Sequence, residues 1–188
     1  MPLTDIQDYY NIKGTRNAKN TKNFEYNCGG YALNTFSWYE PYDMDIDEIE
    51  SEISELIEEG FDKKEIYSII LNRLVKHMLK EIKGLRIIKQ NEDLKPNERL
   101  IYFRYFYELI SDFDDNWEGT TNCYDYVHSD FHFRFYENGH WHEKNGNGPI
   151  HMCDGDDIDG PVWVCGRNAY DSPIIKFALK MGGNNGTE

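Results

Sequence analysis

Cys28 is the side chain whose surroundings best suit covalent chemistry. It stands in YNCGGYAL, residues 26–33, where a helix is predicted to begin at or just after the cysteine. The unpaired N–H groups and positive dipole end of a helix favour the thiolate, the nucleophilic form of cysteine. Gly29 and Gly30 would allow close approach of a substrate, and the turn formed by Gly29, Gly30 and Tyr31 could supply an oxyanion hole. Because a lone cysteine is more often simply buried, the assignment needs a partner base.

That base is expected among the histidines, five of which lie between positions 128 and 151. In DFHFRFYE, residues 130–137, strand alternation puts Phe131, Phe133 and Phe135 on one face and His132 on the other. We expect the phenylalanines to face the core, which leaves the imidazole of His132 free to meet a cleft. His132 is therefore the candidate general base.

The turn at Asn138–Gly139 decides whether His142 can assist His132. A two-residue loop pairs Phe135 with His142 and turns His142 to the apolar face. A three-residue loop with a bulge at Gly139 instead pairs Arg134 with His142, which places it beside His132. Only the second register gives a Cys28–His132–His142 triad, in which His142 orients the ring of His132. The sequence is compatible with both.

Helices precede strands along the chain, which predicts a single α+β domain with an antiparallel sheet. Helices are expected over 28–40, ended by Pro41, over 46–59 and over 62–82; Asp62 and Gly84 are the expected caps of the last. Strands are expected over 85–89, 100–110, 127–137, 140–144 and 162–166, while the type of 174–181 stays open. Residues 1–25 are expected to be an irregular lead-in and 182–188 a fraying tail. Cys165, inside the 162–166 strand, is expected in the core.

The composition predicts an acidic globular protein. The 188 residues are 39% hydrophobic and 15% aromatic, with a formal net charge of -14. That charge repels nucleic acids and anionic membranes, so a basic partner or a neutral substrate is expected. The four cysteines form no CxxC pair, the first residues carry no apolar signal segment, and no stretch approaches the ~20 apolar residues of a membrane span. We therefore expect a cytoplasmic protein with reduced thiols and neither metal nor cofactor.

Two of these segments resemble motifs of papain-like cysteine peptidases, in the NlpC-like and CHAP-like branch. YNCGGYAL resembles the nucleophile segment, in which a cysteine opens a helix and is followed by a small residue and a Tyr-Ala pair. DFHF and the later GHWHEKNG, residues 139–146, resemble the histidine strand and the next strand of bacterial and phage relatives. Those relatives carry a D-aromatic-H-aromatic run and then a G-x-W-x-H-K-x-G run.

The resemblance implies a papain-like fold with a helical insertion at about 42–84. It also implies a peptidase or amidase that acts on a peptide or protein substrate and cleaves a peptide, isopeptide or related acyl bond, or that transfers the acyl group. The family's nucleophile falls on Cys28, its base on His132 and its orienting residue on His142.

Two other functions remain compatible with the sequence. His140 and His142, two apart on a strand, could bind zinc together with Cys153, Asp154 or His151. Alternatively, the acidic run at 43–59, DMDIDEIESEISELIEE, could belong to a non-enzymatic binding protein or inhibitor, such as a nucleic-acid mimic.

Overall fold

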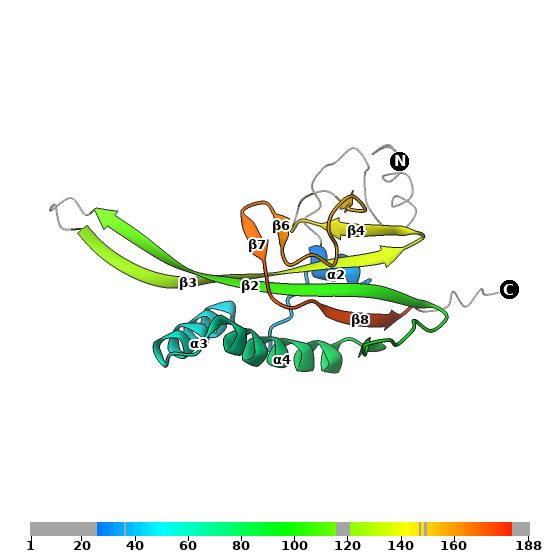
Figure 1. Ribbon diagram of the computed structural model, residues 1–188, viewed down its shortest axis with the longest axis horizontal. Helices are drawn as coiled ribbons and strands as arrows, with labels where there is room; N and C mark the ends of the chain where they lie inside the picture. The colour runs from blue at the N-terminus through cyan, green and yellow to red at the C-terminus, as the bar shows by residue number, and fades with distance from the viewer. Residues whose placement is uncertain (1–25, 36, 116–120, 147, 149, 182–188) are drawn as a thin grey trace.

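The computed structural model describes residues 26–35, 37–115, 121–146, 148 and 150–181, and it shows an α+β fold (Figure 1). The expected lead-in and tail, and the side chain of Cys123, lie outside the described part of the chain. Within it, the helices are α2 (Cys28–Ala32), α3 (Ile46–Glu58) and α4 (Lys63–Glu81). The strands follow: β1 (Leu85–Ile87), β2 (Glu98–Asp115), β3 (Thr121–Glu137), β4 (His140–Lys144), β5 (Ile150–Met152), β6 (Trp163–Cys165), β7 (Asn168–Tyr170) and β8 (Ile175–Lys180). The predicted order of helices before strands is confirmed.

Six strands form one antiparallel sheet in the order β1-β8-β2-β3-β4-β5, and β6 pairs with β7 in a separate hairpin. The undecided segment 174–181 is thus a strand, β8, inserted between β1 and β2. The β2–β3 ribbon is the longest pairing, running from Leu100↔Tyr136 to Asp115↔Thr121. It extends beyond the other strands, so the rest of the sheet gathers around one end of it (Figure 1).

The two faces of the sheet carry different cores, as period-two alternation predicts. The helices pack on the face that presents Phe103, Phe133 and Phe135, all of them buried. The opposite face carries a smaller cluster that includes Trp163 and Tyr170 from the β6–β7 hairpin. Figure 1 shows the hairpin and helices α3 and α4 on opposite sides of the ribbon. A side chain on β3 therefore faces either the helices or the hairpin.

Helix α2 is much shorter than the predicted 28–40 segment. It ends at Ala32, and Asn34 takes a left-handed backbone with φ 58°. The chain then folds back over the helix so tightly that a Cβ on Gly30 would lie 1.8 Å from the carbonyl oxygen of Ser37. The chain can pass this close to the helix only because residue 30 is a glycine, and this return of the chain ends the helix long before Pro41.

The two longer helices follow their predicted boundaries within two residues. Asp62 caps α4 as predicted, and with Glu65 it forms a reciprocal capping box. The C-cap of α4 is Ile82 instead of Gly84, which has φ 86° and lies in the turn to β1. These helices occupy most of the expected insertion at 42–84. None of the helices in the described part of the chain has both the length and the apolar character needed to cross a membrane.

Candidate active site

The β3–β4 hairpin takes the two-residue register, which makes the interpretation of His142 as the orienting residue wrong. Asn138 and Gly139 have φ of 52° and 86°, as a two-residue turn with positive φ at both positions requires. Phe135 pairs with His142, and their rings stack at 5.2 Å between centroids. His142 Nε2 lies 3.2 Å from the backbone oxygen of Glu137, and burial lowers the pKa of the ring. His142 is thus a core histidine on the face opposite His132.

Glu143 occupies the position expected of the orienting residue. Its Oε2 lies 3.1 Å from His132 Nε2 and also accepts a 2.7 Å hydrogen bond from Arg134 Nε. Burial by itself raises the pKa of Glu143, but the hydrogen bonds and positive charges of His132 and Arg134 outweigh it and bring the pKa to about 2. A buried, ionised carboxylate therefore fixes the ring of His132 through one nitrogen.

The sequence did contain a signal for Glu143. The G-x-W-x-H-K-x-G run matches this chain at Gly139, Trp141, Lys144 and Gly146. Counting from those four positions puts the histidine of the run at 143, one residue beyond His142. A carboxylate there can accept the ring N–H that a histidine or an amide would otherwise hold.

Cys28 opens α2 as predicted, but its environment does not lower its pKa. The thiol is buried, and Sγ lies 4.0 Å from the carbonyl oxygen of Phe131, directly before His132. Burial, followed by the negative charge of Asp130, raises the pKa of Cys28 to about 12, while the backbone N–H groups of Phe133 and Gly29 act in the opposite direction. The expected depression of this pKa is wrong because a five-residue helix offers little dipole and the thiol itself is buried.

The oxyanion-hole prediction fails for two of its three residues. The Gly30 N–H donates to Asn27 Oδ1 and the Tyr31 N–H to Asn27 O, both at 3.0 Å. The ring of Tyr31 is buried against Phe135, with centroids 5.0 Å apart. Gly29 is the member whose N–H faces the sulfur. Gly29 and Gly30 chiefly leave room for the chain that folds back over the helix. A Cβ on Gly29 would lie 2.9 Å from the Tyr39 ring, just as a Cβ on Gly30 would meet Ser37.

Cys28 and His132 line one cavity of about 410 Å³. Strand β4 pairs with β3 only from Arg134 onward, so the edge of β3 at 130–132 is left open on that side. Cys28 belongs to the core on the helix face, whereas the His132 ring packs on Tyr170 at 5.2 Å on the hairpin face. The side chains of Cys28 and His132 therefore line the cavity from opposite faces of the sheet, on either side of the open edge of β3. Among the described residues, the His132 hydrogen bond runs to Glu143 and not to Cys28.

The β6–β7 hairpin forms the far wall of this cavity. Arg104, buried on β2, anchors the hairpin by donating to the carbonyl oxygens of Tyr170 and Pro161, at 3.0 and 2.5 Å. Cys165 was expected in the core but is half-buried, lines the cavity and donates to Asn145 Oδ1 at 2.6 Å. The wall thus consists of polar groups held by buried contacts.

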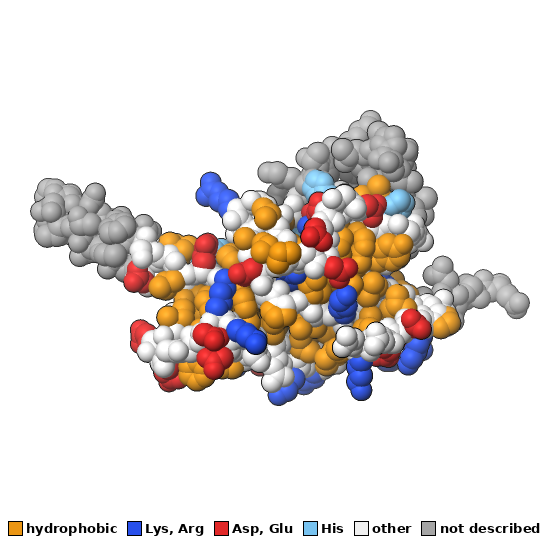
Figure 2. All heavy atoms as spheres, in the orientation of Figure 1, with side chains coloured by type: hydrophobic (Ala, Val, Ile, Leu, Met, Phe, Trp, Pro, Cys, Tyr) orange, Lys and Arg blue, Asp and Glu red, His pale blue; other side chains and the backbone are white. Residues whose placement is uncertain are grey.

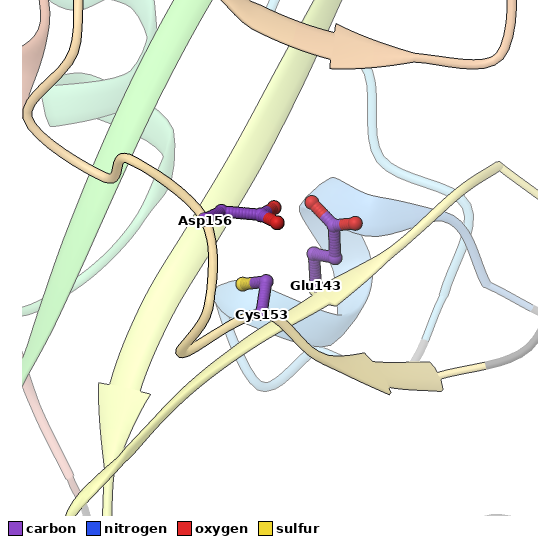
Figure 3. Close-up of side chains that lie close together, drawn as sticks. All are labelled: Glu143, Cys153 and Asp156. Carbon is purple, nitrogen blue, oxygen red and sulfur yellow. The ribbon is translucent and has the colours of Figure 1, made fainter.

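The histidine zinc site, which the sequence left open as an alternative, is not formed among the described residues. The group there that could hold a metal ion is Glu143, Cys153 and Asp156, whose side chains converge in Figure 3. Arg134 already binds both carboxylates, at 2.7 Å to Glu143 and 2.8 Å to Asp156. Burial raises the pKa of Cys153 to about 12, which disfavours the thiolate a metal needs. The cluster of Glu143, Cys153 and Asp156 therefore fits an ion-pair network around Arg134 better than a metal centre. His140, one of the proposed zinc ligands, pairs with Asp154 at 2.6 Å.

Comparison with known proteins adds no relative: no protein-family model, curated protein or solved structure matches the chain.

Proposed function

We propose that this chain is a papain-like cysteine hydrolase, a peptidase or amidase, with Cys28 as nucleophile, His132 as base and Glu143 as orienting residue. The observation that carries the proposal is the His132–Glu143 pair, 3.1 Å apart, at the wall of the cavity that also holds the Cys28 thiol. A nucleophile and a base that line one cavity, with an orienting group bonded to the base, are the parts that acyl transfer through a thiol requires.

The proposed reaction begins with a thiol and not with a thiolate. Since the pKa of Cys28 is raised to about 12, the proton has to leave as the sulfur attacks. Glu143 holds Nε2 of His132, so Nδ1 is the ring nitrogen left to take that proton. Proton transfer requires the two side chains to approach further when substrate fills the cavity.

The reaction then proceeds through acylation of the thiol and hydrolysis of the resulting thioester. Cys28 Sγ forms a bond to the acyl carbon while its proton passes to His132, and the N–H of Gly29 stabilises the carbonyl oxygen. The bond to the amine leaving group breaks, and the amine takes the proton from His132. Water then attacks the thioester, gives a proton to His132, and the released Cys28 sulfur recovers it. A second amine in place of water would give acyl transfer.

A small activated ester tests this chemistry without knowledge of the natural substrate. With p-nitrophenyl acetate, we expect a burst of nitrophenolate close to one equivalent and an acetyl group on the peptide that contains Cys28. Cys28→Ser should abolish the burst, and His132→Ala should slow it by roughly 100-fold or more, as loss of a general base does.

The matched control is His142→Gln, which lies on β4 beside Glu143 but on the other face of the sheet from His132. It should keep the burst if its fold is intact, whereas the sequence-based triad predicts a loss. A full burst in Cys28→Ser, or acetylation spread evenly over the cysteines, contradicts the proposal.

A second candidate, the acidic binding protein, is favoured by the outer face of α3. Asp47, Glu48, Glu55 and Glu58 are all exposed there, and Figure 2 shows carboxylates gathered over this helix. A basic partner would meet them through long-range attraction. If the biological effect of the protein survives Cys28→Ser but falls when these four residues are replaced by their amides, this function replaces the hydrolase.

A further inference from the structure

The cavity at Cys28 is lined by groups that suit a positive charge. Two carboxylates, Asp130 and Glu40, line it together with the aromatic rings of Trp38, Tyr42 and Tyr170. Carboxylates attract cations directly, and aromatic faces attract them through the ring quadrupole. Of the lysine and arginine side chains, Arg167 is the one that lines this cavity within the described residues, and it is exposed.

Asp130 is the carboxylate closest in sequence to the reacting groups. Its Oδ2 accepts hydrogen bonds from Tyr170 Oη at 2.6 Å and Asn168 Nδ2 at 2.7 Å, and its Oδ1 accepts from the Phe131 N–H at 2.8 Å. A carboxylate has about four acceptor positions, so these three neutral donors leave one open on Oδ1. The donors orient Asp130 without cancelling its charge.

Tyr42 brings a second polar group to this cavity. Its side chain is 9% exposed and lines the cavity, but its hydroxyl is buried with no hydrogen-bond partner among the described residues. A buried hydroxyl left unpaired is costly, so a polar group of a substrate is the natural partner.

We propose that this cavity takes acyl substrates that carry a cationic group beside the scissile bond, such as a lysine or arginine side chain. The inference rests on the proposed hydrolase function and names its substrate class. The ammonium or guanidinium group donates to Asp130 Oδ1 and the Tyr42 hydroxyl, and Trp38, at the exposed mouth, lies over its stem.

Such a substrate also assists its own attack. The negative charge of Asp130 is the second cause, after burial, of the raised Cys28 pKa. A cation bound to Asp130 offsets that charge, so the thiol loses its proton more readily when the correct substrate is present. In the free site Cys28 is protonated, so the thiol should react more slowly with neutral compounds than with cationic ones.

Charged thiol reagents of equal chemistry measure this preference directly. The probes are methanethiosulfonates bearing trimethylammonium-ethyl, sulfonato-ethyl or methyl groups. Each forms a mixed disulfide with the Cys28 sulfur, whose proton is lost as methanesulfinate leaves. Rates are read from the mass of the Cys28 peptide and divided by those of N-acetylcysteine. We expect the cationic reagent to exceed the anionic one by about tenfold or more after this correction.

Two variants identify the source of the preference. Asp130→Asn keeps an oxygen that can accept from Tyr170, and it should bring the corrected ratio of cationic to anionic rates close to one. Glu40→Gln, at an exposed position outside the buried network, should lower it less. The matched control is Asp159→Asn, an exposed carboxylate that pairs with Lys176 and does not line the cavity; its ratio should not change.

A corrected ratio near one overturns the cationic substrate, as does a ratio that Asp130→Asn leaves unchanged. Either result leaves the hydrolase standing if the burst with p-nitrophenyl acetate still requires Cys28 and His132. Failure of all three reagents to modify Cys28 in the folded protein overturns both proposals, because the cavity is then closed to ligands.

Discussion

Replacing Glu143 with glutamine separates the observed His132–Glu143 pair from the sequence-based His132–His142 pair. Glutamine keeps the shape of the side chain but removes the charge that His132 and Arg134 share. The fall in the pKa of Glu143 from its ordinary 4.5 to about 2 is worth about 3 kcal/mol at about 1.4 kcal/mol per pKa unit. Because the side chain is only 10% exposed, solvent screens little of this. We expect Glu143→Gln to lower the free energy of unfolding by about 3 kcal/mol, and the Tm by roughly 6–12 °C.

The sign of the pH dependence follows from the same pKa. A carboxyl group whose pKa is depressed in the folded state contributes its full stability above the unfolded value near 4.5 and loses it as the pH falls toward 2. The stability difference between wild type and Glu143→Gln should therefore be largest at pH 6 and shrink at pH 3. Urea unfolding followed by tryptophan fluorescence at a series of pH values measures it.

Asp154→Asn is the matched control, since Asp154 also pairs with a histidine, His140, at 2.6 Å. Both partners are 40% exposed, so this change should cost at most about 1 kcal/mol. Equal losses in the two variants, or a Glu143→Gln loss that does not vary between pH 6 and pH 3, would refute the buried ion pair. The ester burst should also slow in Glu143→Gln but not in Asp154→Asn.

Two further predictions concern how the Cys28 segment is held. Gly30→Ala should destabilise the fold by about 3 kcal/mol or more, because its Cβ would lie 1.8 Å from the Ser37 carbonyl oxygen; Gly155→Ala, with no atom within 4 Å of its Cβ, should be nearly neutral in the same urea titration. Asn27→Ala should cost about 3 kcal/mol, since Asn27 bonds the Gly30 N–H and both backbone groups of Tyr39 at 2.7–3.1 Å while 3% exposed. A cost below about 1 kcal/mol would show that Asn27 does not hold this segment.

The elements that the sequence predicted well are those whose signals are local. The stripes of α3 and α4 and the capping box at Asp62 depend on residues within a few positions of one another. The alternation in β3 likewise placed Phe133 and His132 on opposite faces. Alternation could not predict which elements cover each face of the sheet. The β6–β7 hairpin that covers His132 has strands of three residues each, too short to show a periodic pattern.

The features that sequence reasoning missed depend on contacts between distant segments. The length of α2 is set by the return of the chain at Ser37 against Gly30, not by helix propensity. The pKa of Cys28 is set by burial and by Asp130, about a hundred residues away. Helix position alone therefore indicated the wrong direction for this pKa, since desolvation outweighs the dipole of so short a helix.

The hairpin shows how one residue of register changes a proposed mechanism. Successive residues on β4 face opposite sides, so the turn at Asn138–Gly139 decides whether His142 or Glu143 meets His132. Asn-Gly strongly favours the two-residue turn, and that turn delivers the carboxylate. The ionised carboxylate of Glu143, 3.1 Å from His132 Nε2, attracts the positive charge that develops on the ring as it takes the proton of Cys28, and a neutral histidine carries no such charge. The register that removes the sequence-based triad thus provides the stronger partner for a thiol that must give up its proton during attack.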